Sequence, residues 1–380
     1  MEYVKLEEIC TIVSGGTPSR SKPNYWNNGN IPWIKIKDMK SKYIDSAEEF
    51  ITEEGLNNSS TKMLKRGTIL YSIFATLGEV GILKIDACTN QAIAGLSLKE
   101  DSNILKEYLY YYLKSKKKDV NNLGRGVAQN NINLSLLRKF KIPVIPLCQQ
   151  KKIIEVLDNV SSTINNYERE LALLDELVKA RFVEMFGDPV TNDMLWNTDV
   201  LKDICTKIGS GSTPRGGKES YIDEGISLIR SMNVHNAYFE YKDLAHITLD
   251  QAEKLNNVVV EHDDLLFNIT GASVARCCVV PSDVLPARVN QHVCILRCRE
   301  KINPIFLQGL LVNENYQGKL LQIAKSGATR EAINKQQLES LEIMIPPLEL
   351  QNQFASFVQE IDKSRLLNNH SLLLLKSITF

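Results

Sequence analysis

The 380 residues include 43% hydrophobic ones, which is typical of a globular chain of two or three domains and excludes a disordered one. No stretch of about eighteen apolar residues occurs, and no apolar segment follows a basic start, so we expect a cytoplasmic protein without a membrane partner. Lys plus Arg and Asp plus Glu number 45 each, and this zero net charge argues mildly against a protein that binds DNA without partner proteins.

The first 140 residues or so are predicted to be rich in β-strands. Short apolar runs, such as residues 68–74, 82–85 and 92–98, are separated by Gly, Asn and Asp. Residues 104–114 have the apolar spacing of a helix, and a strand bounded by proline is expected at 141–146. The eight scattered cysteines in a long chain without a signal segment predict reduced thiols.

A long helix is predicted next, because no Pro or Gly occurs from Gln149 to about Phe186. Apolar residues recur there at alternating steps of four and three, which is the heptad pattern of a coiled coil. The seam consists of Ile153, Leu157, Val160, Ile164, Tyr167, Leu171, Leu174 and Val178. Gly187 and Pro189 predict its end.

The rest of the chain repeats this order. The segments 6–11, 14–18, 90–91 and 142–147 return as 201–206, 210–214, 290–291 and 343–348. Matches in one order, at offsets of about 195 to 201 residues, indicate duplication of a whole domain rather than a short solenoid repeat. The divergent side chains predict similar folds that act on different targets.

A second long helix is expected from about Gln351 to the C-terminus. Its seam contains Phe354, Val358, Ile361, Leu372 and Leu375, and is interrupted by Arg365 and Asn368. We expect the two helices to pack antiparallel. The predicted fold class is therefore α+β: two β-rich domains in internal repeat (1–148 and 188–349), separated by two long antiparallel coiled-coil helices (149–187 and 350–380).

No catalytic residue and no metal ligand is proposed from the sequence. The stretch nearest to a phosphate-binding loop, residues 211–219, has Glu219 where a hydroxyl should hold magnesium. His292, Cys294 and Cys298 could suggest a metal site, but no paired Cys-x-x-Cys supports it, and Cys294 fits a buried strand better. No methyltransferase, metalloprotease or hydrolase motif is present.

Repeated loops carry the residue types that read DNA: Arg or Lys for guanine, Asn or Gln for adenine, and glycines for close approach to phosphate. The candidate DNA-binding residues are Gly15, Thr17, Arg20, Lys35, Lys37, Asn90, Gln91, Arg125, Gln129, Asn130, Arg215, Arg230, Asn233, Asn290, Gln291, Thr329 and Arg330. Three alternatives stay open: the first loop is an ordinary Gly-Pro turn, the loop from 124 is merely solvated, or the Asn-Gln pairs cap turns.

Taken together, Ser14–Pro18, Tyr25-Trp26, Ile31–Ile34, Gly67–Ser72, Asn90-Gln91 and Ile142–Leu147 resemble the specificity subunits of Type I restriction-modification systems. The resemblance implies a non-catalytic protein whose two target-recognition domains each read half of a bipartite site in double-stranded DNA. It implies two modification subunits that use S-adenosylmethionine to methylate adenine, and it allows restriction subunits that form an ATP-dependent endonuclease. It implies no cofactor in this chain.

Two rival interpretations remain at this stage. The chain could be the recognition portion of a catalytic restriction or methyltransferase enzyme, which the missing catalytic motifs disfavour. It could also be a protein-interaction scaffold, which the Gly loops bearing Arg and amides disfavour.

Overall fold

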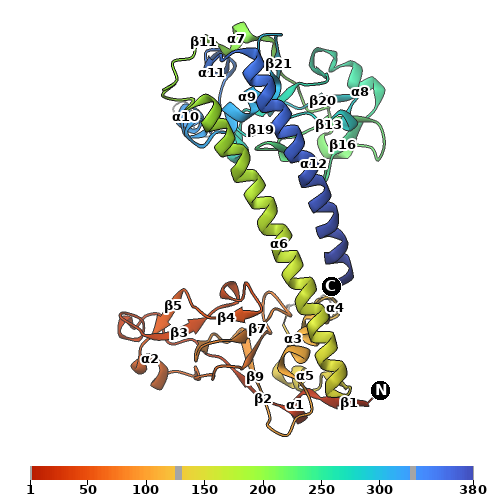
Figure 1. Cartoon of the computed structure of the whole chain (residues 1–380). Coiled ribbons are helices and arrows are strands. Elements are labelled where there is room, and N and C mark those ends of the chain that lie inside the picture. The colour runs from red at the N-terminus through yellow and green to blue at the C-terminus, as the bar shows by residue number, and fades with distance from the viewer. Residues whose placement is uncertain (1, 125–130, 326–330, 380) are drawn as a thin grey trace. The chain divides into compact units, whose positions relative to one another are not determined.

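The computed structural model describes residues 2–124, 131–325 and 331–379. The chain forms two compact units: unit 1 contains residues 1–168 and 371–380, and unit 2 contains residues 169–370. Each unit combines β-sheets with helices, and two long helices, α6 (Leu147–Phe186) and α12 (Leu348–Thr379), contribute to both units (Figure 1). The predicted α+β class, with two β-rich domains and long helices, is confirmed.

Unit 1 is built from two sheets and a set of short helices. Its strands are β1 (Glu2–Lys5), β2 (Cys10–Ser14), β3 (Ile31–Ile34), β4 (Tyr43–Ile44), β5 (Glu49–Ile51), β6 (Ile69–Ser72), β7 (Val80–Leu83), β8 (Cys88–Thr89), β9 (Ile93–Leu98) and β10 (Lys141–Val144). Its helices are α1 (Leu6–Ile9), α2 (Glu53–Asn57), α3 (Lys106–Ser115), α4 (Lys117–Gly124) and α5 (Leu134–Arg138), with 3-10 turns η1 (Pro23–Tyr25) and η2 (Ile36–Asp38). The main sheets have the orders β2-β9-β6-β7-β4 and β5-β3-β8, and β1 pairs with β10.

The central strand β6 is apolar from Ile69 to Tyr71 because it is buried on both faces. Ile69 and Tyr71 belong to the core that includes α3, whereas Leu70 between them belongs to the core on the other face of the sheet. Successive side chains of a strand point to opposite faces, so a strand buried on both faces reads as a continuous apolar run rather than an alternating one. All four residues of β6 are buried.

Unit 2 repeats this plan. Its strands are β11 (Thr198–Val200), β12 (Cys205–Ser210), β13 (Ile226–Ile229), β14 (Val234–His235), β15 (Tyr238–Phe239), β16 (Ala245–Ile247), β17 (Val259–Val260), β18 (Leu265–Asn268), β19 (Cys277–Val279), β20 (Ala287–Val289), β21 (Val293–Cys298) and β22 (Glu342–Met344). Its helices are α7 (Leu201–Ile204), α8 (Leu249–Glu253), α9 (Pro304–Val312), α10 (Glu314–Lys325) and α11 (Lys335–Glu339), with 3-10 turns η3 (Gly217–Ser220), η4 (Ser231–Asn233), η5 (Asn256–Val258), η6 (Gly271–Ser273) and η7 (Ser282–Val284).

The sheets of unit 2 have the orders β12-β21-β18-β19 and β16-β13-β20-β17, β14 pairs with β15, and β11 pairs with β22 as β1 pairs with β10. The counterpart of β6 is β18, whose Leu265 and Phe267 face one core and Leu266 the other. The duplication that was read from the sequence is therefore a duplication of fold.

The long helices pack antiparallel inside unit 2. Phe354 near the start of α12 meets Phe182 near the end of α6, with ring centroids 5.5 Å apart. Further along α12, the Arg365 guanidinium is 2.6 Å from the Asp175 carboxylate, which lies earlier in α6. Arg365 and Asn368 lie half-buried at seam positions, so the seam continues through polar residues.

The predicted seam of α6 fits the burial of its residues except at the start. Positions 157, 160, 164, 167, 171, 174 and 178 are half-buried. Ile153 is instead 38% exposed, and its neighbour Ile154 packs on the core of unit 1 with Leu157, because this end of the helix is held by the domain and not by another helix. None of the helices within the described ranges is long and apolar enough to cross a membrane.

A buried glutamine links the start of each long helix to its domain by hydrogen bonds. In unit 1, Gln150 accepts a hydrogen bond from the Leu105 N–H at 2.8 Å and donates to the Asn103 and Ile145 carbonyls at 2.7 and 2.9 Å. Gln351 makes the equivalent bonds at the start of α12 in unit 2. Both side chains are fully buried, so these hydrogen bonds take the place of bonds to water that the amides make in the unfolded chain.

Replacing Gln150 by leucine is expected to lower the free energy of unfolding of unit 1 by about 1–3 kcal/mol, because the substitution leaves the part-buried Leu105 N–H and the Asn103 and Ile145 carbonyls without this partner. Urea unfolding of the whole chain measures this loss. Gln149→Leu is the matched control, since Gln149 is exposed and should change stability by no more than about 0.5 kcal/mol. Equal effects of the two substitutions would contradict the fastening role.

Candidate nucleic-acid interface

Three loops that are far apart in the sequence meet at one edge of unit 1. The Gly16 N–H of the first loop donates to the Thr89 carbonyl at 2.9 Å, and the Trp33 indole N–H donates to the Gly16 carbonyl at 3.0 Å. The Asn90 N–H donates to the Ile34 carbonyl at 3.2 Å. The loop 14–20, the end of β3 and the Asn-Gln turn thus form one structure, which we call loop cluster 1.

Glycine is required in this cluster. A Cβ on Gly15 would lie 2.2 Å from the Asn90 carbonyl oxygen, and one on Gly211, its counterpart in unit 2, would lie 1.8 Å from the Val289 carbonyl oxygen. The Gly211 N–H donates to the Asn290 carbonyl at 3.1 Å, so the same loops meet in unit 2 and form loop cluster 2. Gly15 therefore lies in close contact with the Asn-Gln turn. Its role in allowing a phosphate to approach stays a prediction.

The asparagines of the Asn-Gln pairs take one of the two roles that the sequence left open, the capping of turns. The Asn90 Oδ1 accepts a hydrogen bond from the Ala92 N–H at 3.1 Å, and the Asn290 Oδ1 accepts one from the His292 N–H at 3.0 Å. Each asparagine therefore caps its own turn. Gln91 and Gln291 are exposed, and the amide oxygen of each accepts a hydrogen bond from a threonine of the first loop, Thr17 or Thr213.

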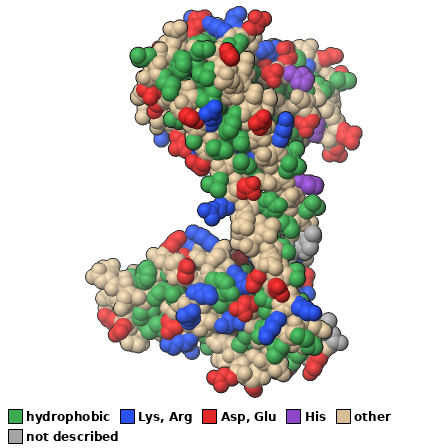
Figure 2. Space-filling view, viewed as in Figure 1, with side chains coloured by type: hydrophobic (Ala, Val, Ile, Leu, Met, Phe, Trp, Pro, Cys, Tyr) green, Lys and Arg blue, Asp and Glu red, His purple; other side chains and the backbone are tan. Residues whose placement is uncertain are grey.

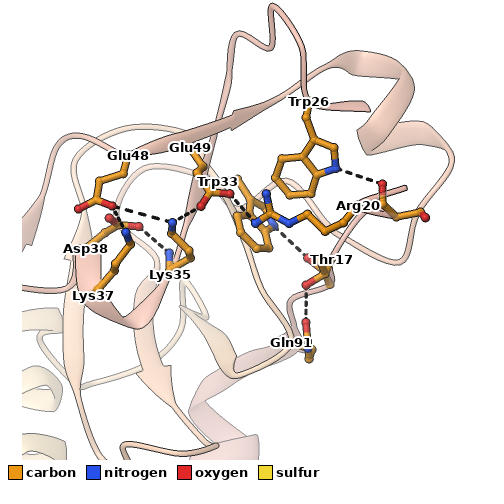
Figure 3. A network of polar contacts seen from close by, with 12 residues as sticks. Thr17, Arg20, Trp26, Trp33, Lys35, Lys37, Asp38, Glu48, Glu49 and Gln91 are labelled. Atoms are coloured by element: carbon orange, nitrogen blue, oxygen red, sulfur yellow. Dashed lines mark hydrogen bonds and ion pairs between the residues drawn. The ribbon is translucent and has the colours of Figure 1, made fainter. Parts of the chain in front are cut away.

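The predicted cations of loop cluster 1 are paired with two carboxylates (Figure 3). The Arg20 guanidinium lies 3.6 Å above the Trp26 ring and 2.5 Å from a carboxylate oxygen of Glu49. Lys35 forms an ion pair with the other oxygen of Glu49, and Lys37 forms one with Glu48. The stack on Trp26 orients Arg20 at the surface.

Both carboxylates are held in their charged form. Burial alone would raise the pKa of Glu49, but hydrogen bonds from Lys35 and Arg20 outweigh it, so this pKa lies below its usual value. The hydrogen bond from Lys37 lowers the pKa of Glu48. At neutral pH the cluster therefore presents cations that are already partly neutralised, and a phosphate would have to compete with these carboxylates.

In loop cluster 2 the predicted residues lie in different surroundings. Arg215 is exposed and makes no ion pair with the residues that the structure describes. Arg230 donates to the Asp243 carbonyl and lies 5.4 Å from the Tyr221 ring. Asn233 is fully buried, where it accepts from the Arg230 N–H at 3.1 Å and donates to the Glu240 carbonyl at 2.9 Å. Its amide holds the η4 turn, so we leave it out of the proposed interface.

Five predicted contacts fall outside the described residues: Arg125, Gln129, Asn130, Thr329 and Arg330. The chain next to each of these segments bonds to residues that follow β6 or β18. In unit 1 the Ile132 N–H donates to the Ile73 carbonyl at 2.9 Å, and in unit 2 the Gly271 N–H donates to the Glu331 carbonyl at the same distance.

A cleft of about 540 Å³ opens beside loop cluster 2. It is lined by Ser231, Met232, Thr270, Gly271, Ala272, Ser273, Arg276, His292, Glu331 and Ala332. Among the residues 2–124, 131–325 and 331–379, no group of three or more His, Cys, Asp and Glu could hold a metal ion. Cys294 is buried in β21, and burial raises the pKa of its thiol to about 12.

Sequence reasoning missed the carboxylates Glu48 and Glu49, the Trp26 stack and the contact of His292 with the Asn-Gln turn. Acidic residues are not among the residue types that read bases or bind phosphate, and no motif links His292 to the Asn-Gln turn. The recurrence of Thr17 as Thr213, each directly before a proline, was the one available signal for the Thr–Gln pairs. On the face drawn in Figure 2, Lys and Arg side chains are intermixed with Asp and Glu on both units.

The comparisons agree with this architecture. The chain is 26% identical over 398 residues to the Type I restriction enzyme MjaIX specificity subunit of Methanocaldococcus jannaschii, covering 98% of this chain and 89% of that protein. It is 34% identical to the EcoR124I/EcoR124II specificity subunit of Escherichia coli over 188 residues, which are 48% of this chain and 46% of that protein.

Solved structures show the same fold. The S subunit of a Type I restriction-modification system from M. genitalium aligns over 100% of this chain and 93% of its own, with a TM-score of 0.58 and 15% identity. A chain from a structure of the assembly of a type I R-M system aligns over 100% and 95%, with a TM-score of 0.60 and 18% identity. The model of the Type I restriction modification DNA specificity domain matches residues 1–175 and again 194–376, so the chain belongs to that family.

Proposed function

We propose that this chain is the DNA-recognition subunit of a Type I restriction-modification complex, in which each unit reads one half of a bipartite site in double-stranded DNA. The observation that carries the proposal is that one loop cluster is built twice, with the same Thr–Gln contact in each copy. Recognition of two different half-sites is served by one backbone fold that carries different side chains in each copy. Lys37 and Met232, which hold equivalent positions after β3 and β13, are an example of that difference.

The chemistry of the complex belongs, in this proposal, to partner subunits. Two modification subunits would bring S-adenosylmethionine and methylate adenine, and restriction subunits can add an ATP-dependent endonuclease. In unit 2 the long helices expose Leu173, Leu177, Leu366 and Leu367, whose side chains are 57%, 47%, 71% and 70% exposed. Exposed leucines of this kind support a role of the helices in holding partner subunits.

Replacing Glu49 by glutamine is expected to raise the affinity of the assembled complex for non-specific DNA by roughly three- to tenfold at low salt, because it frees Arg20 and Lys35 for phosphate. The slope of log K against log salt should steepen by about 0.9 for each additional phosphate contact. Fluorescence anisotropy with a DNA duplex at several salt concentrations measures both quantities.

Glu100→Gln is the matched control for this charge change, since Glu100 is exposed and makes no ion pair within the described parts of the chain. If both substitutions raise the affinity equally, only the net charge matters and loop cluster 1 does not meet phosphate.

The proposed function is tested by binding selection. The complete chain, assembled with its modification subunits, is offered a library of randomised duplexes, and the bound DNA is sequenced. The proposal predicts a motif of two short words separated by a spacer of constant length. Bound DNA without any motif, in a complex that assembles normally, would instead favour a protein-interaction scaffold.

A further inference from the structure

The amide of Gln291 lies between two hydrogen-bond partners. Thr213 donates its hydroxyl proton to Oε1, so the amide nitrogen lies on the other side, 3.2 Å from Nε2 of His292. An amide nitrogen can only donate, so Nε2 of His292 accepts, and the ring carries its proton on Nδ1. That N–H donates to the Thr270 hydroxyl at 2.6 Å. Thr213 and His292 therefore hold the amide of Gln291 from two sides.

The hydrogen bonds to Thr213 and His292 use half of the hydrogen-bonding capacity of the Gln291 amide. Oε1 has two lone pairs and Nε2 has two protons, so one acceptor site and one donor site remain on the exposed side chain. The major-groove edge of adenine presents a donor at N6 and an acceptor at N7, and a glutamine amide matches this pair with two hydrogen bonds. The other bases do not present that combination on one edge: guanine offers only acceptors there, cytosine a donor, and thymine an acceptor beside a methyl group.

Gln91 repeats the arrangement in unit 1. Its Oε1 accepts from Thr17, and it is exposed between the loop that carries Arg20 and the turn capped by Asn90. The position of His292 is occupied by Ala92, so the amide of Gln91 lacks the second partner that a histidine gives to Gln291. Arg20 and Arg215 lie on the loops whose threonines bind Gln91 and Gln291. A cation on the same loop suits a side chain that enters a groove between phosphates.

Resting on the function proposed above, we propose that Gln291 and Gln91 are specificity-determining residues that each contact one adenine in the major groove, one in each half of the bipartite site. Thr213 and His292 are positioning residues for Gln291, and Thr17 is the positioning residue for Gln91. The capping asparagines hold the backbone of the turn and do not contact bases.

The test uses the complete chain assembled with its modification subunits and the motif that this wild-type complex selects. Gln291→Ala should lower discrimination in favour of adenine at one position of one half-site by roughly 10- to 100-fold. Gln91→Ala should do the same at one position of the other half-site. Gln149→Ala is the control, since Gln149 is exposed at the start of α6. Wild-type complex should also lose affinity when that adenine is replaced by 7-deaza-adenine, and the Gln291→Ala complex should not.

Thr213→Val separates orientation from folding, because valine keeps the shape of threonine and removes its donor. It should reduce adenine discrimination while leaving the melting temperature of the chain unchanged. An unchanged motif with both glutamine variants would overturn the base contacts. A wild-type complex that selects no motif would overturn the proposed function itself, and the base contacts with it.

Discussion

Replacing Arg297 by serine lowers the free energy of unfolding of unit 2 by an expected 3–5 kcal/mol or so, because it leaves the carboxylate of Asp264 buried without its counter-charge. Asp264 is fully buried in the turn before β18. Arg297 binds both of its oxygens, at 2.8 and 2.9 Å, and also donates to the Val259 carbonyl at 3.0 Å. Native-state hydrogen exchange measures the loss in unit 2, with the amides of unit 1 as an internal reference.

The chain supplies its own control for this substitution. In unit 1 the equivalent positions are Thr68 and Ser97, whose hydroxyls lie 3.2 Å apart. The double substitution Asp264→Thr with Arg297→Ser transplants this neutral pair, and it should recover at least half of the stability that Arg297→Ser loses. If the double variant is as unstable as the single one, the buried charge is not the cause of the loss.

Replacing Phe186 by alanine should lower the free energy of unfolding of unit 2 by about 3–5 kcal/mol, because it opens a cavity in a core of packed rings. Phe186 is fully buried, with its ring centroid 4.8 Å from that of Phe306 and 5.6 Å from that of Phe354. These rings join the end of α6, the helix α9 and the start of α12. The loss should therefore loosen the start of α12 as well as the domain.

Proteolysis of the folded chain across a urea series measures this effect, with fragments assigned to each unit by mass spectrometry. Val183→Ala on the same helix is the matched control, since Val183 is 47% exposed and should change stability by no more than about 0.5 kcal/mol. Equal protease sensitivity of the two variants would show that the rings do not hold the long helices to unit 2.

The architecture could be predicted from the sequence because its signals are long or repeated. The absence of Pro and Gly over residues 149–186 and the alternating steps of four and three predicted α6, which begins two residues earlier than expected, at Leu147. The repeated order of short motifs predicted two similar folds. Ile153 was predicted in the helix seam but is exposed. Periodicity identifies the apolar face of a helix, but it does not say whether another helix or a domain covers that face.

The loop clusters could be predicted only in part. The recurrence of Asn-Gln marked the right turns, but only the three-dimensional contacts show that the asparagine caps the turn while the glutamine is held outward by a threonine. Glu49 begins the short strand β5 and forms ion pairs with Arg20 and Lys35, which lie 29 and 14 positions earlier in the chain. Pairing of this kind leaves no spacing signal in the sequence. Asn233 shows the converse, since an amide of the expected type is buried and bonded to the backbone of Arg230 and Glu240.

The central claim is that this chain gives a Type I complex a two-part DNA target, and mapping of methylated bases by single-molecule sequencing tests it most directly. DNA is compared from cells that carry this chain with its modification subunit and from cells that carry the subunit alone. The account predicts a split motif with methylated adenine that depends on the chain, and exchange of residues 1–145 for another module should change one half of that motif only. Methylation of the same motif without the chain, or no motif in its presence, would contradict the account.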